Sequence, residues 1–166
     1  MVTEESVFDV LCTIDDPEMP VSIVDLGIVE SVRIDAPDPV AVRVEIDILP
    51  TFVGCPALSL IESEIKRKLT AVRGVSGVVV NFKFAPPWTV DRISTRGREA
   101  LRKVGITVPA RSPDNVDQAP SCPFCGSTDV KLESSFGPTR CRMIYHCEAC
   151  RHPFEHLKRV PLPTTR

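Results

Sequence analysis

The stretch VAVRVEIDIL, residues 40–49, decides the fold of the first part of the chain. Val and Ile at positions 42, 44, 46 and 48 alternate with Arg43, Glu45 and Asp47. A period of two puts the apolar set on one face and the charged set on the other, which is typical of a half-buried β-strand. Residues 28–34 form a second apolar run, and the intervening Ala-Pro-Asp-Pro turn predicts an antiparallel hairpin.

Helical patterns lie on both sides of this hairpin. Thr3 is a suitable N-cap for a short amphipathic helix, and Pro56 suits the first position of a helix whose apolar stripe runs through residues 58–72. Residues 75–84 predict a third strand, and residues 94–104 predict a last helix. The order of elements predicts an α+β fold, a small sheet with helices packed against it.

Two Cys-x-x-Cys motifs stand near the end of the chain. Cys122 and Cys125 form the first, Cys147 and Cys150 form the second, and 21 residues separate the two pairs. This spacing is typical of a zinc ribbon, in which each motif presents two thiolates to one tetrahedral ion. The intervening and following segments, residues 129–136, 140–146 and 153–160, predict three short strands.

The cysteine-rich part is small, so a bound metal must supply much of its folding energy. Structural zinc sites contribute roughly 10–16 kcal/mol in isolated peptides at pH 7. Zinc is the expected ion. Iron, as a single ion or in an iron–sulfur cluster, is the alternative because it also accepts four thiolates. Cys141 is left over as a spare thiol.

The chain divides by composition as well as by cysteine content. We predict a first domain at residues 1–107, a Pro-, Asp- and Ser-rich linker at 108–120 and a metal-binding module at 121–166. Residues 1–120 carry a net charge of −5 and residues 121–166 a net charge of +3. Four thiolates and one divalent ion would remove most of the positive excess of the tail.

Composition excludes several classes of function. The 166 residues have a net charge of −2, which gives no basic footprint for nucleic acid, and no long apolar stretch predicts a membrane span. The acidic N-terminus MVTEESVFDV does not resemble a secretory signal, so we expect a cytoplasmic protein with reduced thiols. No nucleotide-binding or hydrolase motif occurs, so we expect no catalytic site.

Cys55 and three carboxylates are the candidate site residues of the first domain. Cys55 is expected at or beside a helix N-terminus, where backbone N–H groups and the helix dipole stabilise a thiolate. The residues alone nevertheless favour a buried structural cysteine. For Asp16 and Glu18 they favour turn chemistry over a metal site. They leave open whether Asp25 caps a turn or lies near Cys55.

Three segments together resemble the iron–sulfur cluster assembly factors, a family also called domain of unknown function 59. These are DDPEMPVSIVDLGIVESV, PTFVGCPALSLIE and FAPPWTVDRISTRGREALRKVGI. With the four-cysteine tail, the chain is similar to the D subunits of bacterial phenylacetyl-CoA epoxidase systems. The resemblance implies that Cys55 is the functional thiol, with a transient iron–sulfur cluster, and that Asp16, Glu18 and Asp25 lie near it.

The resemblance also implies a function. It predicts an accessory factor that helps to assemble or repair iron–sulfur or other metal centres in the epoxidase complex of aerobic phenylacetate degradation. The expected recipient is the iron–sulfur reductase or the di-iron oxygenase of that complex, and a homodimer is an open alternative to a monomer. The competing hypothesis is a non-catalytic structural component of the oxygenase complex.

Overall fold

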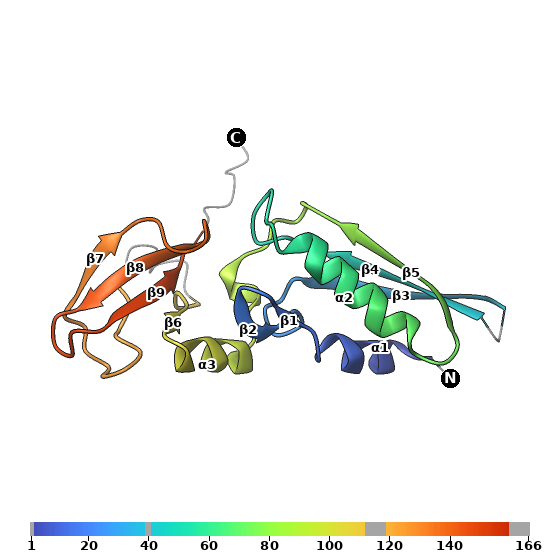
Figure 1. Ribbon diagram of the computed structural model, residues 1–166, viewed down its shortest axis with the longest axis horizontal. Helices are drawn as coiled ribbons and strands as arrows, with labels where there is room; N and C mark the ends of the chain where they lie inside the picture. The colour runs from blue at the N-terminus through green and yellow to red at the C-terminus, as the bar shows by residue number, and fades with distance from the viewer. Residues whose placement is uncertain (1, 39–40, 112–118, 160–166) are drawn as a thin grey trace. The chain divides into compact units, whose positions relative to one another are not determined.

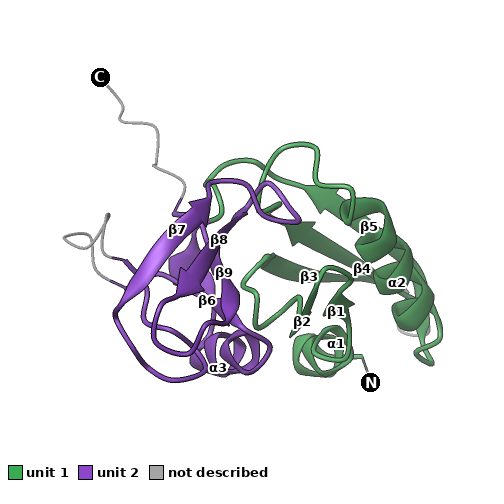
Figure 2. Ribbon diagram, turned by 60° about the vertical axis from the view of Figure 1, so that its left-hand side comes forward, with its two compact units in different colours: residues 1–88 green, residues 89–166 purple. Residues whose placement is uncertain are grey.

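The computed structural model describes residues 2–38, 41–111 and 119–159. Contacts divide the chain into two compact units, Met1–Trp88 and Thr89–Arg166 (Figure 2). Unit 1 holds a two-stranded and a three-stranded sheet, and unit 2 holds a four-stranded sheet. The predicted division at residues 107 and 120 stays a prediction, because most of the proposed linker lies outside the described residues.

Unit 1 is built on a three-stranded sheet that two helices cover (Figure 1). Its elements are α1 (Glu4–Leu11), β1 (Asp15–Asp16), β2 (Met19–Ser22), β3 (Val29–Asp38), β4 (Ala41–Ile48), α2 (Leu58–Thr70) and β5 (Val75–Phe82). The strand order is β3-β4-β5. β3 and β4 pair antiparallel, which confirms the hairpin, whereas β5 is parallel to β4 because α2 returns the chain to the same end of the sheet.

The alternation in β4 separates an apolar face from a polar face. Val44, Ile46 and Ile48 are completely buried. On the opposite face Asp47 accepts a hydrogen bond from Arg33 Nη1 at 2.9 Å, a bond that is also an ion pair. The register places apolar residues opposite apolar residues and charged residues opposite charged residues, since Val32 pairs with Ile46 and Arg33 pairs with Glu45. The apolar face therefore belongs to the core, and α1 and α2 close it.

The caps of the two helices differ. Thr3 caps α1 as predicted, and its side chain accepts from the Ser6 N–H at 3.2 Å. α2 begins at Leu58, so the prediction that Pro56 takes the first helical position is wrong. Residues 56–57 form a turn instead, because the Leu58 N–H donates to the carbonyl of Cys55 at 3.3 Å.

Unit 2 contains a four-stranded sheet and a short helix. Its elements are η1 (Val90–Arg92), α3 (Thr95–Lys103), β6 (Ile106–Thr107), β7 (Val130–Ser134), β8 (Arg142–Cys147) and β9 (Pro153–Leu157), with strand order β6-β9-β8-β7. The antiparallel β7–β8–β9 ribbon confirms the three predicted strands. β6 pairs parallel with β9, so residues we predicted as part of the first domain extend the ribbon sheet.

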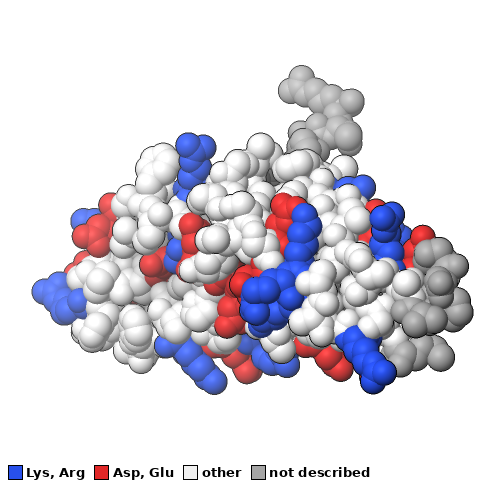
Figure 3. Space-filling model, turned by 45° about the vertical axis from the view of Figure 1, so that its right-hand side comes forward, with Lys and Arg blue, Asp and Glu red and all other residues white. Residues whose placement is uncertain are grey.

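Two surface properties bear on function. Among the described residues, no helix has the length and apolar character needed to cross a membrane. On the face shown in Figure 3, Lys and Arg side chains are interspersed with Asp and Glu side chains. That face lacks the single-sign basic surface typical of proteins that bind nucleic acid.

Candidate functional site

The two Cys-x-x-Cys motifs form matching turns in unit 2. In the first, the Gly126 N–H donates to the carbonyl of Cys122 at 2.9 Å, and in the second the Arg151 N–H donates to the carbonyl of Cys147 at 2.9 Å. Gly126 and Arg151 both have positive φ, 78° and 64°. A non-glycine residue rarely adopts this conformation. The second turn accepts it because the chain must bend back in the same way to present both thiols.

The four sulfurs of these turns converge. Cys122 Sγ lies 3.6 Å from Cys150 Sγ, and Cys125 Sγ lies 3.6 Å from Cys147 Sγ. All four ligand atoms lie within 4.8 Å of one another. Tetrahedral zinc–sulfur bonds of about 2.3 Å would place sulfurs about 3.8 Å apart. The donor set therefore fits a zinc ion, and these are the four cysteines predicted from spacing.

The electrostatics of the cluster are consistent with a bound cation. Burial favours the neutral thiol of Cys122, but the backbone N–H groups of Cys125 and Phe124 donate to it and lower its pKa to about 7. The His152 N–H lowers the pKa of Cys150, yet burial and the neighbouring sulfurs outweigh it and raise the pKa to about 12. One thiolate thus hinders the ionisation of the next. A bound divalent ion would remove this hindrance, because its positive charge stabilises each thiolate and lowers the pKa of each thiol.

Two of the four cysteines also belong to the core of the ribbon. Cys122 and Cys147 are buried with Phe154, and Val130 and Tyr145 pack against them. Few other large apolar side chains of the described residues share this cluster, so a bound ion would add to the stability of the ribbon. Cys141 is buried outside the group, with its sulfur 3.1 Å from Thr139 Oγ1.

Cys55 belongs to unit 1, on the loop that leaves β4. Three hydrogen bonds join the neighbouring loops at this edge: Leu49 N–H to the Ile28 carbonyl (2.7 Å), Lys83 N–H to the Ile48 carbonyl (2.8 Å), and Trp88 Nε1–H to the Leu26 carbonyl (3.0 Å). Three segments therefore meet the sheet at the same edge: the turn that carries Asp25, the loop that carries Cys55 and the segment after β5. The carboxyl ends of parallel strands are a usual place for ligands in such sheets.

The local backbone presents the Cys55 thiol. Gly54 has a φ of 81°, and nothing lies within 4 Å of the position that a Cβ would take there. Glycine is favoured at position 54 because the turn requires a positive φ, not because a larger side chain would clash with a neighbour. Cys55 is half-buried and lies two residues before Ala57, the N-cap of α2. The prediction of a thiol beside a helix N-terminus is thus matched in position, whereas its role stays a prediction.

The carboxylates have local partners. Asp16 is buried, and its Oδ1 accepts from the backbone N–H groups of Glu18 at 2.8 Å and Met19 at 3.0 Å. Asp25 Oδ2 accepts from the Ser22 hydroxyl at 3.1 Å, which fixes the next turn. Within the described ranges, neither carboxylate nor Glu18 nor Cys55 belongs to a cluster of three or more metal-ligating side chains. Whether they act with a cargo at Cys55 stays a prediction.

Unit 2 also holds a basic cavity that was not predicted from the sequence. Arg98 and Arg102 line it from α3, and Lys158 and Arg159 line it from the end of β9. The spacing of Arg98 and Arg102, four residues apart on a predicted helix, would place both on one face. That spacing was the only signal in the sequence for this feature.

Comparison with protein families gives two matches. Residues 4–82 match the family model described as iron–sulfur cluster assembly protein, and residues 107–158 match the model described as PaaD zinc beta ribbon domain. The first covers nearly all of unit 1, including Cys55, and the second covers all four tail cysteines. Each match thus contains one of the two candidate sites.

Individual relatives agree with this division. A protein of Escherichia coli (strain K12), provisionally named as the D component of 1,2-phenylacetyl-CoA epoxidase, is 36% identical over 155 residues, which cover 92% of this chain and 90% of that protein. An Fe-S protein maturation auxiliary factor of Porphyromonas gingivalis is 35% identical over 104 residues. The aligned region covers 63% of this chain and 92% of that protein.

Solved structures resemble the first part of the chain. A crystal structure of domain of unknown function 59 from Bacillus anthracis has a TM-score of 0.54 and 34% identity, and it covers 59% of this chain and 90% of that chain. A conserved hypothetical protein from Thermotoga maritima has a TM-score of 0.50 and 33% identity, covering 59% and 92%. Both comparisons confirm the α+β fold expected from the sequence.

Proposed function

The chain belongs to the iron–sulfur cluster assembly protein family, and from this premise we propose that it assembles or repairs metal centres in a phenylacetyl-CoA epoxidase complex. In this proposal it is a cytoplasmic accessory factor without a catalytic site of its own. Cys55 holds iron or an iron–sulfur cluster as cargo. The four tail cysteines hold a resident zinc ion.

The observation that carries the proposal is the setting of Cys55. Its thiol is half-buried on a loop at the carboxyl edge of β4 and β5, and two exposed apolar side chains flank it along the chain. Val53 is 77% exposed and Leu60 is 59% exposed. Exposed apolar residues beside a thiol suit transient docking of a recipient protein.

The transfer step is an exchange of ligands. The Cys55 thiol loses a proton when its sulfur binds iron, and thiolates of the recipient then replace that sulfur while Cys55 recovers a proton. No electron has to move in this exchange. Asp16, Glu18 and Asp25 support the loop in the proposal, and the iron–sulfur reductase or the di-iron oxygenase of the complex is the recipient.

The resident zinc has a different task. Cys122, Cys125, Cys147 and Cys150 would hold it, and a closed four-sulfur site supplies folding energy rather than chemistry on a substrate. In this proposal the ribbon gives unit 2 a fixed surface. The exchange at Cys55 does not involve the zinc.

Anaerobic reconstitution with ferrous iron and sulfide tests the proposal. We expect the wild-type protein to gain visible absorbance and Cys55→Ser to lose at least nine tenths of it, because the hydroxyl is a poor ligand for iron. Cys12→Ser is the matched control and should behave like the wild type, since Cys12 lies at the end of α1. Equal absorbance in Cys55→Ser and wild type would refute the role of Cys55.

A second candidate is a structural component that only stabilises the oxygenase assembly. The exposed aromatic side chains of unit 2 favour it, because Phe124 is 53% and Phe136 is 75% exposed. Such residues are typical of stable protein interfaces. A constant equimolar complex on co-purification would support this candidate, whereas a substoichiometric effect would support the maturation factor.

A further inference from the structure

The basic cavity of unit 2 is separate from the four-cysteine group. It has a volume of about 740 Å³. Its lining residues come from α3, β6, β8, β9, the two residues after β9, and residues 108–110, 119–121 and 128. Among the described residues, none that lines it is Asp or Glu. A cavity of this size is in the range that holds small molecules.

Positive charge is concentrated around this cavity. Arg159 pairs with Asp91 at 2.6 Å, and the guanidinium groups of Arg98 and Arg111 lie nearby, donating to the Pro109 and Ile93 carbonyls. Burial lowers the pKa of Arg98, and the charges of Arg111 and Arg159 lower it further. Among the described residues, three guanidinium groups thus share the Asp91 carboxylate, which leaves a local excess of positive charge.

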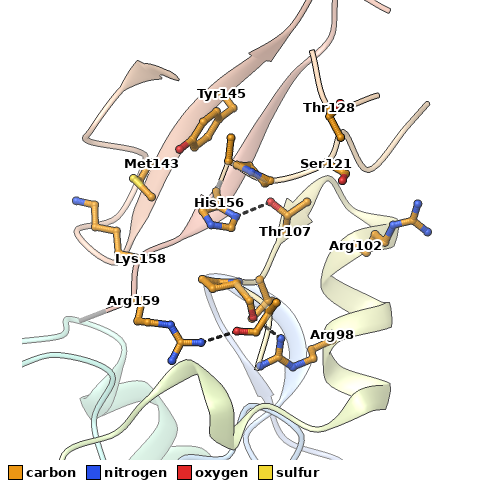
Figure 4. A pocket seen from close by; sticks show the side chains of 15 residues that line it. Arg98, Arg102, Thr107, Ser121, Thr128, Met143, Tyr145, His156, Lys158 and Arg159 are labelled. Atoms are coloured by element: carbon orange, nitrogen blue, oxygen red, sulfur yellow. Dashed lines mark hydrogen bonds between the residues drawn. The ribbon is translucent and has the colours of Figure 1, made fainter. Parts of the chain in front are cut away.

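Several donors of the cavity have no partner within the described part of the chain. The guanidinium group of Arg102 is on the exposed side of α3 and has no hydrogen bond or ion pair there. The ammonium group of Lys158 has only a contact with the ring face of Phe136, at 4.8 Å from the ring centroid. The hydroxyl of Tyr145 likewise has no hydrogen bond within those residues. Figure 4 shows Arg102 and Lys158 on either side of His156, so the free cations lie around the cavity rather than at one point.

His156 gives the cavity a neutral acceptor. The Thr107 hydroxyl donates to the Glu155 carbonyl at 3.1 Å, so it accepts from His156 Nδ1–H at 2.7 Å. The Nε2 atom therefore carries a lone pair. Burial lowers the pKa of His156 to about 4, and the ring is neutral at pH 7.

We propose that this cavity binds a small organic anion with at least two negative charges, held by Arg102 and Lys158 and donating a hydroxyl or N–H group to His156. The oxyanion groups of the ligand would accept hydrogen bonds from Arg102 and Lys158. Their negative charge would offset the excess positive charge of Arg98, Arg111 and Arg159. Phosphate esters and polycarboxylates share this chemistry. The site goes beyond the proposed handling of metal at Cys55 and does not depend on it.

Titration of the full-length, zinc-loaded protein with ADP, pyrophosphate and citrate tests the proposal. We expect at least one of them to bind with a Kd below about 1 mM at low salt, with chemical-shift changes at Tyr145 and His156. Binding should weaken as ionic strength rises. Preference for ADP and pyrophosphate would identify a phosphate ligand, and preference for citrate would identify a polycarboxylate.

Variants connect the binding to the named residues. Arg102→Ala and Lys158→Ala should each raise the Kd about tenfold, since each removes a charged hydrogen-bond donor. Lys103→Ala is the matched control, because Lys103 follows Arg102 on α3 and does not line this cavity. The proposal is overturned if none of the three anions binds, or if Arg102→Ala and Lys158→Ala bind as tightly as Lys103→Ala.

Discussion

Cys147→Ser is expected to release the metal ion and unfold the ribbon of unit 2. Cys147 is completely buried and is both a ligand and a core residue of the ribbon. A structural zinc site is worth roughly 10–16 kcal/mol. That is comparable to the whole stability of a typical domain, about 5–15 kcal/mol, so the folded ribbon should not survive the loss. Zinc content should fall from one ion per chain to below one tenth.

Cys141→Ser is the matched control for this experiment. Cys141 is also a buried cysteine of the tail, but it lies outside the four-sulfur group and contacts Thr139. The control should keep its zinc and the dispersed amide signals of β7, β8 and β9, while Cys147→Ser loses both and unit 1 keeps its signals. A folded ribbon without metal in Cys147→Ser would contradict the structural role of the ion.

Under the proposed function, Cys55→Ser should sharply reduce epoxidase activity in cells. In the proposed exchange the sulfur is the ligand for the cargo, and a serine hydroxyl stays protonated at pH 7 and does not replace it. We expect ring-epoxidising activity to fall at least tenfold in cells that carry only the variant. The measurement is turnover of phenylacetyl-CoA in extracts, with protein abundance determined in parallel.

The control for Cys55→Ser is Cys12→Ser, expressed at the same level. It removes a half-buried thiol of unit 1 that lies at the end of α1, away in the sequence from the loop that carries Cys55. This control should retain full activity. Full activity of Cys55→Ser at normal abundance would show that the thiol is dispensable and would leave the hypothesis of a structural component.

The fold was predictable wherever a pattern repeats. The alternation around Ile46 predicted the hairpin of β3 and β4, and the paired motifs at Cys122 and Cys147 predicted the sulfur group that the structure shows. No repeating sequence pattern predicts the parallel pairing of β4 with β5, because that pairing depends on the path of the chain through α2. β6 has two residues, too few for a period to be visible.

The start of α2 and the basic cavity show where prediction from the sequence fails for single residues. Pro56 suits a first helical position, yet a turn at residues 56–57 moves the start of the helix to Leu58. The cavity brings Arg102 together with Lys158, which are far apart in the sequence. Only tertiary packing puts such residues in one place. For Asp16 the residues alone favoured turn chemistry, and its carboxylate does cap its own turn, whereas the role near Cys55 that the resemblance implies stays a prediction.

Native mass spectrometry of protein purified without air tests the central claim most directly, that the resident ion and the cargo occupy separate sites. The wild type should carry one zinc ion per chain as isolated and should gain iron after anaerobic loading. Cys55→Ser should carry the same zinc ion and gain no iron. A freshly isolated protein without any bound metal, or a Cys55→Ser variant that loads iron like the wild type, would contradict the account.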